Sequence, residues 1–225
     1  PILYDVDDIR DGGSFTTRRV VASQRGKAIF NTSLSFQILE PGLNHQSEMP
    51  DCPGPENLSD DSQRWDKIRK KLDPLAKASS NKYRPRLLPI QLRSVDPINY
   101  LNPVARKAEQ FVWIKTAGEL PKEEDTSLHN AILAYASDYN LMSTALMPHE
   151  VSIMDPKLQP ASLDHAIWFH DSFRVDEWLL YHMDSQRSSR GRGLSRGTFY
   201  SRDGRLVAST IQEGLMRLRD SSKAK

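Results

Sequence analysis

A carboxylate, a hydroxyl and an amide are groups that can take up protons or donate hydrogen bonds in catalysis. Asp138, Ser162 and Gln212 carry such groups, but 24 and 50 residues separate them, so only the fold could bring them together. Asp138 continues a helical stripe of two alanines, Ala131 and Ala134, which would let that side of the helix approach a sheet; an ordinary surface acid is the alternative. Gln212 shares a strand face with apolar residues, which predicts a buried amide, although a purely structural hydrogen bond would satisfy it equally well. Ser162 precedes a strand, where a hydroxyl usually belongs to a turn.

Two histidines, His165 and His170, are further candidates because imidazole changes charge near neutral pH. Their odd spacing places them on opposite faces of an alternating strand. No carboxylate cluster completes a zinc-ligand set with them, and Cys52 is the only cysteine. The sequence therefore favours structural histidines and predicts neither a metal site nor a cofactor.

Alternating hydrophobicity predicts the strands that must position these residues. Strands expected over 2–9, 15–22 and 28–39 are joined by short turns, which is typical of an antiparallel meander. Alternation also predicts one strand over 163–169 and, after a polar break, a strand over 177–184 that contains the apolar run 178–181. The remaining strands are expected over 87–95, 108–117, 193–201 and 205–217.

Helical spacing predicts two helices. The first is expected over 63–75, where Pro74 would end it. The second follows the possible N-cap residues 125–127 and continues through Tyr139. Around the first helix, residues 40–82 are rich in proline and predict an interdomain linker on the surface. Residues 4–36 and 181–214 repeat one plan of strand, polar loop, strand, glycine turn and strand. Such a repeat indicates two copies of one unit.

Composition narrows the class of protein. The 225 residues carry 31 basic and 29 acidic side chains, a net charge of +2, which predicts no nucleic-acid partner. No apolar run approaches the roughly 18 residues of a membrane span. A single cysteine excludes an intrachain disulfide and favours a reducing, intracellular compartment.

Residues 161–181, ASLDHAIWFHDSFRVDEWLLY, resemble the signature SLDHxxWFHxxFxxDEWLLY of the acyl-CoA thioesterase II (TesB-type) family. The resemblance implies an α+β double hotdog fold, in which two antiparallel sheets each wrap one helix. It also implies that the N-terminal hotdog is truncated at its start. The corresponding divisions are 1–40 for the end of the N-terminal unit, 41–83 for the linker, 84–220 for the C-terminal unit and 221–225 for a tail.

The resemblance implies an enzyme that hydrolyses fatty acyl-CoA to a free fatty acid and coenzyme A by direct attack of water. Asp138 matches the family's base or water-orienting residue, Ser162 its hydroxyl, and Gln212 its amide on the last strand. Coenzyme A is then part of the substrate. Arg187, Arg190, Arg192 and Arg196 form a basic cluster in a Ser- and Gly-rich stretch that is expected to be a loop. Arg187, Arg190 and Arg192 are the candidates to contact the coenzyme A phosphates, although solvated loop charges are the commoner case.

Two other functions stay open. A hotdog hydratase or dehydratase would need an Asp–His pair at the helix, and His129 is badly spaced from Asp138 for that role. A non-catalytic acyl-CoA-binding or assembly protein is the second alternative, because an incomplete first hotdog would expose an apolar face. The family also implies a homo-oligomer, either a dimer or a tetramer. The terminal KAK would become a plausible peroxisomal address if a Leu followed it; otherwise a cytoplasmic location is expected.

Overall fold

The structure is a computed structural model that describes residues 1–72, 89–121 and 126–219. The chain divides into two compact units, Pro1–His45 and Gln46–Lys225, which are described separately. The first unit is an antiparallel sheet of β1 (Leu3–Asp11), β2 (Phe15–Gln24) and β3 (Lys27–Gln37), in that order. Its predicted meander is confirmed. Arg25 and Gly26, with φ of 52° and 74°, form the two-residue turn between β2 and β3.

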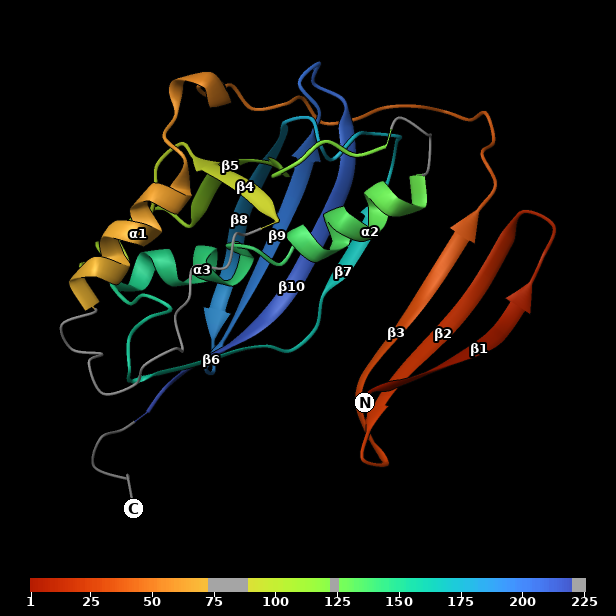
Figure 1. The fold of residues 1–225 in the computed structure, drawn as a ribbon, viewed down its shortest axis with the longest axis horizontal. Helices are drawn as coiled ribbons and strands as arrows, with labels where there is room; N and C mark the ends of the chain where they lie inside the picture. Colours follow the sequence, from red (N-terminus) through yellow and green to blue (C-terminus); the bar gives the residue numbers. More distant parts are fainter. Residues whose placement is uncertain (73–88, 122–125, 220–225) are drawn as a thin grey trace. The chain divides into compact units, whose positions relative to one another are not determined.

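The second unit contains a seven-stranded sheet with the order β4-β5-β8-β9-β10-β6, and β7 also pairs with β10 (Figure 1). Every pairing is antiparallel. The strands are β4 (Ile90–Ser94), β5 (Glu109–Thr116), β6 (Leu158–Ser162), β7 (Ala166–Phe169), β8 (Leu179–Ser189), β9 (Arg192–Tyr200) and β10 (Leu206–Leu218).

Helices α2 (Thr126–Ala136) and α3 (Leu141–Leu146) cover one face of this sheet, with the short 3-10 turn η3 (Met147–His149) after them (Figure 1). Leu133 and Ala136 of α2 pack into a buried cluster with Val175, Phe199 and Ala208. Burying these apolar side chains is the main force that holds the helix on the sheet. The core therefore lies between the two helices and β5, β8, β9 and β10.

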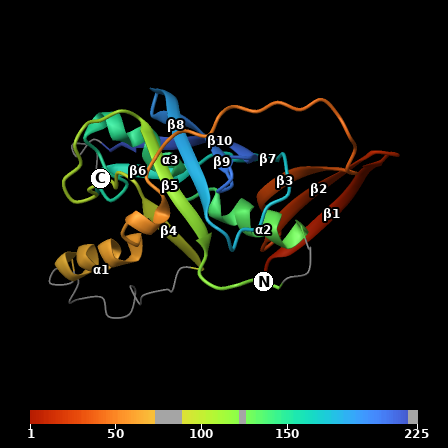
Figure 2. The ribbon, with the colours of Figure 1, turned by 90° about the horizontal axis from the view of Figure 1, so that it is seen from above.

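The opposite face of the sheet carries Trp113, Leu180 and Tyr200, which are covered by residues of the 49–58 segment, including Met49. This segment contains the 3-10 turn η1 (Pro55–Asn57), and α1 (Asp61–Leu72) follows it beside β4 (Figure 2). The described part of the predicted linker, from Gln46 through α1, thus belongs to the second unit and packs against its sheet. Its helix begins two residues earlier than predicted, and the predicted stop at Pro74 lies outside the described residues.

The predicted single strand over 163–169 is wrong in its boundaries. The chain forms β6 up to Ser162 and β7 from Ala166, with a break between them. At the break the carboxylate of Asp164 accepts a hydrogen bond of 2.7 Å from the backbone N–H of Glu213. A side chain thus provides an acceptor to β10 where the strand pairing is interrupted, and alternation in the sequence cannot reveal this replacement.

Helix α2 buries a different face from the one predicted. Its buried residues are His129, Leu133 and Ala136, whereas Ala131 is exposed. Apolar residues occur on several sides of this helix, so periodicity alone does not select one face. The helix ends at Ala136, and Asp138 lies in the turn that follows it. Among the described residues, no helix is long and apolar enough to cross a bilayer.

Candidate active site

The structure brings Asp138, Ser162 and Gln212 together. The amide Nε2 of Gln212 donates to Asp138 Oδ1 at 2.6 Å, and the hydroxyl of Ser162 donates to the same oxygen at 3.4 Å. Asp138 Oδ2 has no hydrogen-bond partner among the described residues. The carboxylate is exposed to solvent. One of its oxygens is therefore held by protein donors, and the other is available to a water molecule.

Asp138 lies in a turn, 137–140, whose two ends are fixed from the sheet. The hydroxyl of Tyr181 on β8 donates to the backbone carbonyl of Ser137 at 2.7 Å. At the other end, Gln110 Nε2 on β5 donates to the carbonyl of Asn140 at 3.3 Å. Asn140 has a φ of 65°, a left-handed conformation that asparagine tolerates better than most residues. Buried side chains of two strands thus determine where the carboxylate lies.

Gln212 and Ser162 come from strands that pair with each other. Gln212 lies in the middle of β10 and is 1% exposed, as the sequence predicted. Ser162 is the last residue of β6, and its Cα pairs with that of Gly214 on β10. The break in pairing at Asp164 ends β6 at Ser162. This arrangement places a hydroxyl and an amide beside the same carboxylate.

His165 lies on the edge of this group of residues. Its Nε2 is 2.7 Å from the hydroxyl of Ser137, which also donates to the carbonyl of Ala134 at 2.8 Å. Because a serine hydroxyl has one proton, this arrangement favours the tautomer in which His165 Nε2 donates. Burial lowers the pKa of His165, and the nearby carboxylates of Asp138 and Asp164 oppose that effect.

The other two candidate histidines make structural contacts. His170 Nε2 lies 2.9 Å from Ser209 Oγ, and burial lowers the pKa of His170. His129 is buried, and its Nδ1 accepts a hydrogen bond of 3.2 Å from the backbone N–H of Val175. Asp138 receives its hydrogen bonds from Gln212 and Ser162 and none from His129 among the described residues, which disfavours the hydratase alternative.

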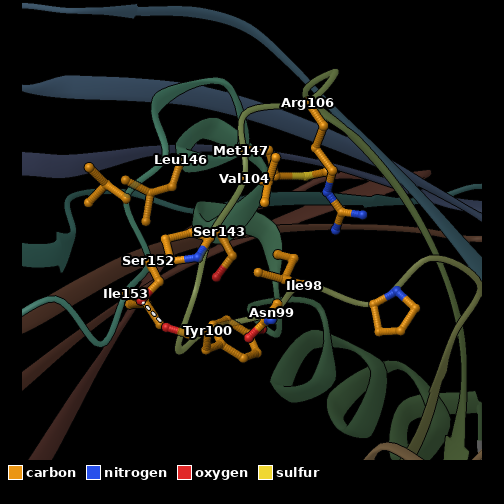
Figure 3. A pocket seen from close by; sticks show the side chains of 13 residues that line it. Ile98, Asn99, Tyr100, Val104, Arg106, Ser143, Leu146, Met147, Ser152 and Ile153 are labelled. Atoms are coloured by element: carbon orange, nitrogen blue, oxygen red, sulfur yellow. Dashed lines mark hydrogen bonds between the residues drawn. The ribbon is translucent and has the colours of Figure 1, made fainter.

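A cavity of about 180 Å³ lies in the same unit, between the loop that contains Tyr100 and α3. Figure 3 shows Tyr100, Ser143 and Ser152 around it, with Ser152 Oγ donating to the Tyr100 carbonyl at 2.8 Å. Its lining is mostly apolar and includes none of Asp138, Ser162 and Gln212. The cavity is therefore distinct from the carboxylate site.

The arginine cluster lies on a hairpin rather than in a flexible loop, which corrects the prediction. Arg187 belongs to β8, Arg190 to the turn, and Arg192 and Arg196 to β9. Arg192 Nε pairs with Glu213 at 2.9 Å, and Arg196 Nε pairs with Asp184 at 2.7 Å. Two of the four guanidinium groups are therefore already engaged by carboxylates of neighbouring strands.

Sequence reasoning did not identify Tyr181 or Ser137 as part of this site. Tyr181 packs in the core and is 1% exposed, and because its one proton is donated to the carbonyl of Ser137, its oxygen accepts from Thr210 Oγ1 at 2.9 Å. Burial raises the pKa of Tyr181, so the phenol stays protonated as a donor to Ser137. This role depends on the hydrogen bond from Tyr181 to a turn that lies 44 residues away in the sequence, which a sequence pattern does not indicate.

Comparison with known proteins places the chain among thioesterases. A family model described as acyl-CoA thioesterase matches residues 94–215. Acyl-CoA thioesterase 2 of Haemophilus influenzae is 37% identical over 218 residues, which cover 96% of this chain and 74% of that protein. The crystal structure of the acyl-CoA thioesterase II TesB2 from Mycobacterium marinum is 38% identical, with a TM-score of 0.75, covering 97% of this chain and 74% of that one.

A second solved structure supports the fold alone. It is a conserved protein of unknown function with a hot dog fold from Alicyclobacillus acidocaldarius, 15% identical, with a TM-score of 0.71 over 97% of this chain and 74% of that one. The predicted double hotdog architecture is confirmed by these structural neighbours. The match over residues 94–215 and the identity to the Haemophilus and Mycobacterium marinum proteins show that this chain belongs to the acyl-CoA thioesterase family.

Proposed function

We propose that the protein hydrolyses fatty acyl-CoA to a free fatty acid and coenzyme A by direct attack of water, with Asp138 as the base. The observation that carries this proposal is the arrangement of donors on Asp138: Gln212 and Ser162 both donate to Oδ1. A carboxylate held in this way is oriented and keeps Oδ2 for a water proton. General-base catalysis needs a positioned group within hydrogen-bond reach of that proton.

In the proposed reaction, Asp138 Oδ2 takes a proton from water as the water oxygen bonds to the thioester carbonyl carbon. Collapse of the tetrahedral intermediate breaks the carbon–sulfur bond, and the proton passes to the departing thiolate of coenzyme A. The Nε2 of Gln212 carries two hydrogens, and one of them forms the hydrogen bond to Asp138 Oδ1. Its second N–H is assigned to the water or to the carbonyl oxygen, where a donor stabilises developing negative charge.

Two exposed side chains that neighbour site residues in the sequence are the candidates to contact a fatty acyl chain. Leu163, which follows Ser162, is 51% exposed, and Tyr135, one helical turn before Asp138, is 57% exposed. Exposed apolar side chains beside a polar centre are typical of sites that bind apolar ligands. We assign the acyl chain to this surface. Arg187 and Arg190 remain the candidates for the coenzyme A phosphates, because they make no ion pair among the described residues. Arg192 would have to leave Glu213 to contribute.

Membership of the acyl-CoA thioesterase family also supports two further proposals. The first is a homo-oligomeric assembly, and the second is a role in fatty acid metabolism inside the cell. Sedimentation of the purified protein would measure the assembly, and a monomer at micromolar concentration would contradict it. A reporter placed at the N-terminal end, with the natural C-terminus left free, would locate the protein. Peroxisomal or diffuse signal would distinguish the two predicted locations.

The experiment that tests the proposed function follows coenzyme A release with a thiol reagent over a series of acyl-CoA chain lengths. We expect turnover to depend on chain length, and we expect Ser162→Ala and Gln212→Met to lower kcat for every substrate.

Arg187→Ala and Arg190→Ala are expected to raise KM without changing kcat, and KM values equal to that of the parent protein would remove both residues from the phosphate site. Binding of acyl-CoA without turnover would favour the non-catalytic alternative.

A further inference from the structure

Two buried polar atoms beside the site are unsatisfied. Gln212 Oε1 and Ser195 Oγ are both buried, and neither has a hydrogen-bond partner among the described residues. Each residue is 1% exposed. A buried acceptor or donor without a partner costs free energy, so native proteins rarely leave one unpaired. Two such atoms close together indicate an interaction that joins them.

The strand register places these two residues opposite each other. Gln212 on β10 pairs with Ser195 on β9 in an antiparallel ladder. Side chains of directly opposed residues lie on the same face, with Cβ atoms about 4.5–5.5 Å apart. A serine hydroxyl can donate and accept, whereas the amide oxygen can only accept. Rotation of the Ser195 side chain, or a single water molecule, would therefore connect the two.

We infer that Ser195 is a positioning residue for Gln212, whose hydroxyl donates to Oε1 directly or through one water molecule. This inference rests on the proposed function of Gln212. The Nε2 of Gln212 faces Asp138 Oδ1 at 2.6 Å. A flipped amide would instead set Oε1 against the carboxylate, oxygen against oxygen. A donor at Oε1 thus keeps the N–H end of the amide toward Asp138 in every turnover.

The neighbouring strand provides a matched control. Ser185 on β8 lies opposite Ser195 on its other side, and its hydroxyl donates to the backbone carbonyl of Leu194 at 2.7 Å. Ser185→Ala removes the same atom from the same face of the sheet without touching Gln212. We expect it to keep the parental kcat.

The test is a double-mutant cycle on acyl-CoA hydrolysis by the intact protein. Ser195→Ala is expected to lower kcat about five- to tenfold, as loss of one buried hydrogen bond would, with little change in KM. In a Gln212→Met background it should have no further effect, because the amide that it orients is gone. Ser195→Cys keeps the volume and offers a weak donor, so its kcat should fall between those of serine and alanine.

The outcomes separate this inference from the proposed function. If Gln212→Met lowers kcat but Ser195→Ala and Ser195→Cys do not, the inference is wrong and the assignment of Gln212 stands. Equal losses from Ser195→Ala in both backgrounds would also overturn it, since independent effects indicate a purely structural role. If Gln212→Met itself keeps full turnover, both the assignment of Gln212 and the inference fail.

Discussion

The amide nitrogen of Gln212 lies 2.6 Å from Oδ1 of Asp138, although 74 residues separate them in the sequence. One residue is buried in the middle of a strand, and the other is exposed in a turn between two helices. Their contact depends on the turn 137–140 being held against the sheet.

Removing the hydroxyl of Tyr181 should loosen the turn that carries Asp138. In Tyr181→Phe the buried carbonyl of Ser137 loses its donor, and Thr210 loses a partner. We expect a loss of about 1–3 kcal/mol in the free energy of unfolding and a lower kcat. Urea unfolding and coenzyme A release measure the two effects. Tyr4→Phe is the control, because that side chain is 65% exposed and its phenol has no hydrogen-bond partner among the described residues; if both variants behave alike, the turn does not depend on Tyr181.

Gly197 provides the space that Tyr181 occupies. A Cβ added at Gly197 would lie 2.2 Å from Tyr181 Cε2, so the ring or the strand would have to move. Gly197→Ala should therefore destabilise the protein by about 1–3 kcal/mol, as overpacking of a core does. Gly118→Ala is the matched control, since a Cβ there meets no atom within 4 Å. Equal melting temperatures for the two variants would contradict the predicted close contact.

Most of the strands could be predicted from alternation and turn residues, because a strand with one buried and one solvated face has a hydrophobic period of two. The break between β6 and β7 could not be predicted in this way. There the carboxylate of Asp164 accepts a hydrogen bond from the backbone of β10, and no pattern of hydrophobicity indicates such a bond. The buried face of α2 was also missed: Ala131, on the predicted side, is exposed, whereas His129 and Leu133 are buried. The meeting of Asp138 with Gln212 followed only from the family resemblance, because it depends on pairing between distant strands.

Stability should fall as the pH drops from about 7 to 5. Burial lowers the pKa of His165 below its ordinary value of 6.5, and burial also lowers that of His170. The unfolded chain then binds protons more readily than the folded one, so stability is full above 6.5 and declines as the pH falls through 6.5 toward the folded pKa values.

Melting temperatures measured from pH 8 to pH 5 check this prediction. His165→Asn should flatten the decline in that range, whereas a variant that declines as steeply as the parent would exclude His165 as its source. Carboxylates act in a separate range. The hydrogen bond from Ser201 and the guanidinium of Arg205 lower the pKa of Asp203 to about 2, so its contribution is lost only in stronger acid.

The most direct test of the account is coenzyme A release by Asp138→Asn compared with the parent protein. Asparagine keeps the size of the side chain but cannot accept the proton of the attacking water. We predict a loss of about 10²–10⁴-fold in kcat with an unchanged melting temperature. The control, Asp51→Asn, changes an exposed carboxylate of the same unit and should keep full activity. Parental turnover by Asp138→Asn would contradict the central claim that this carboxylate is the base.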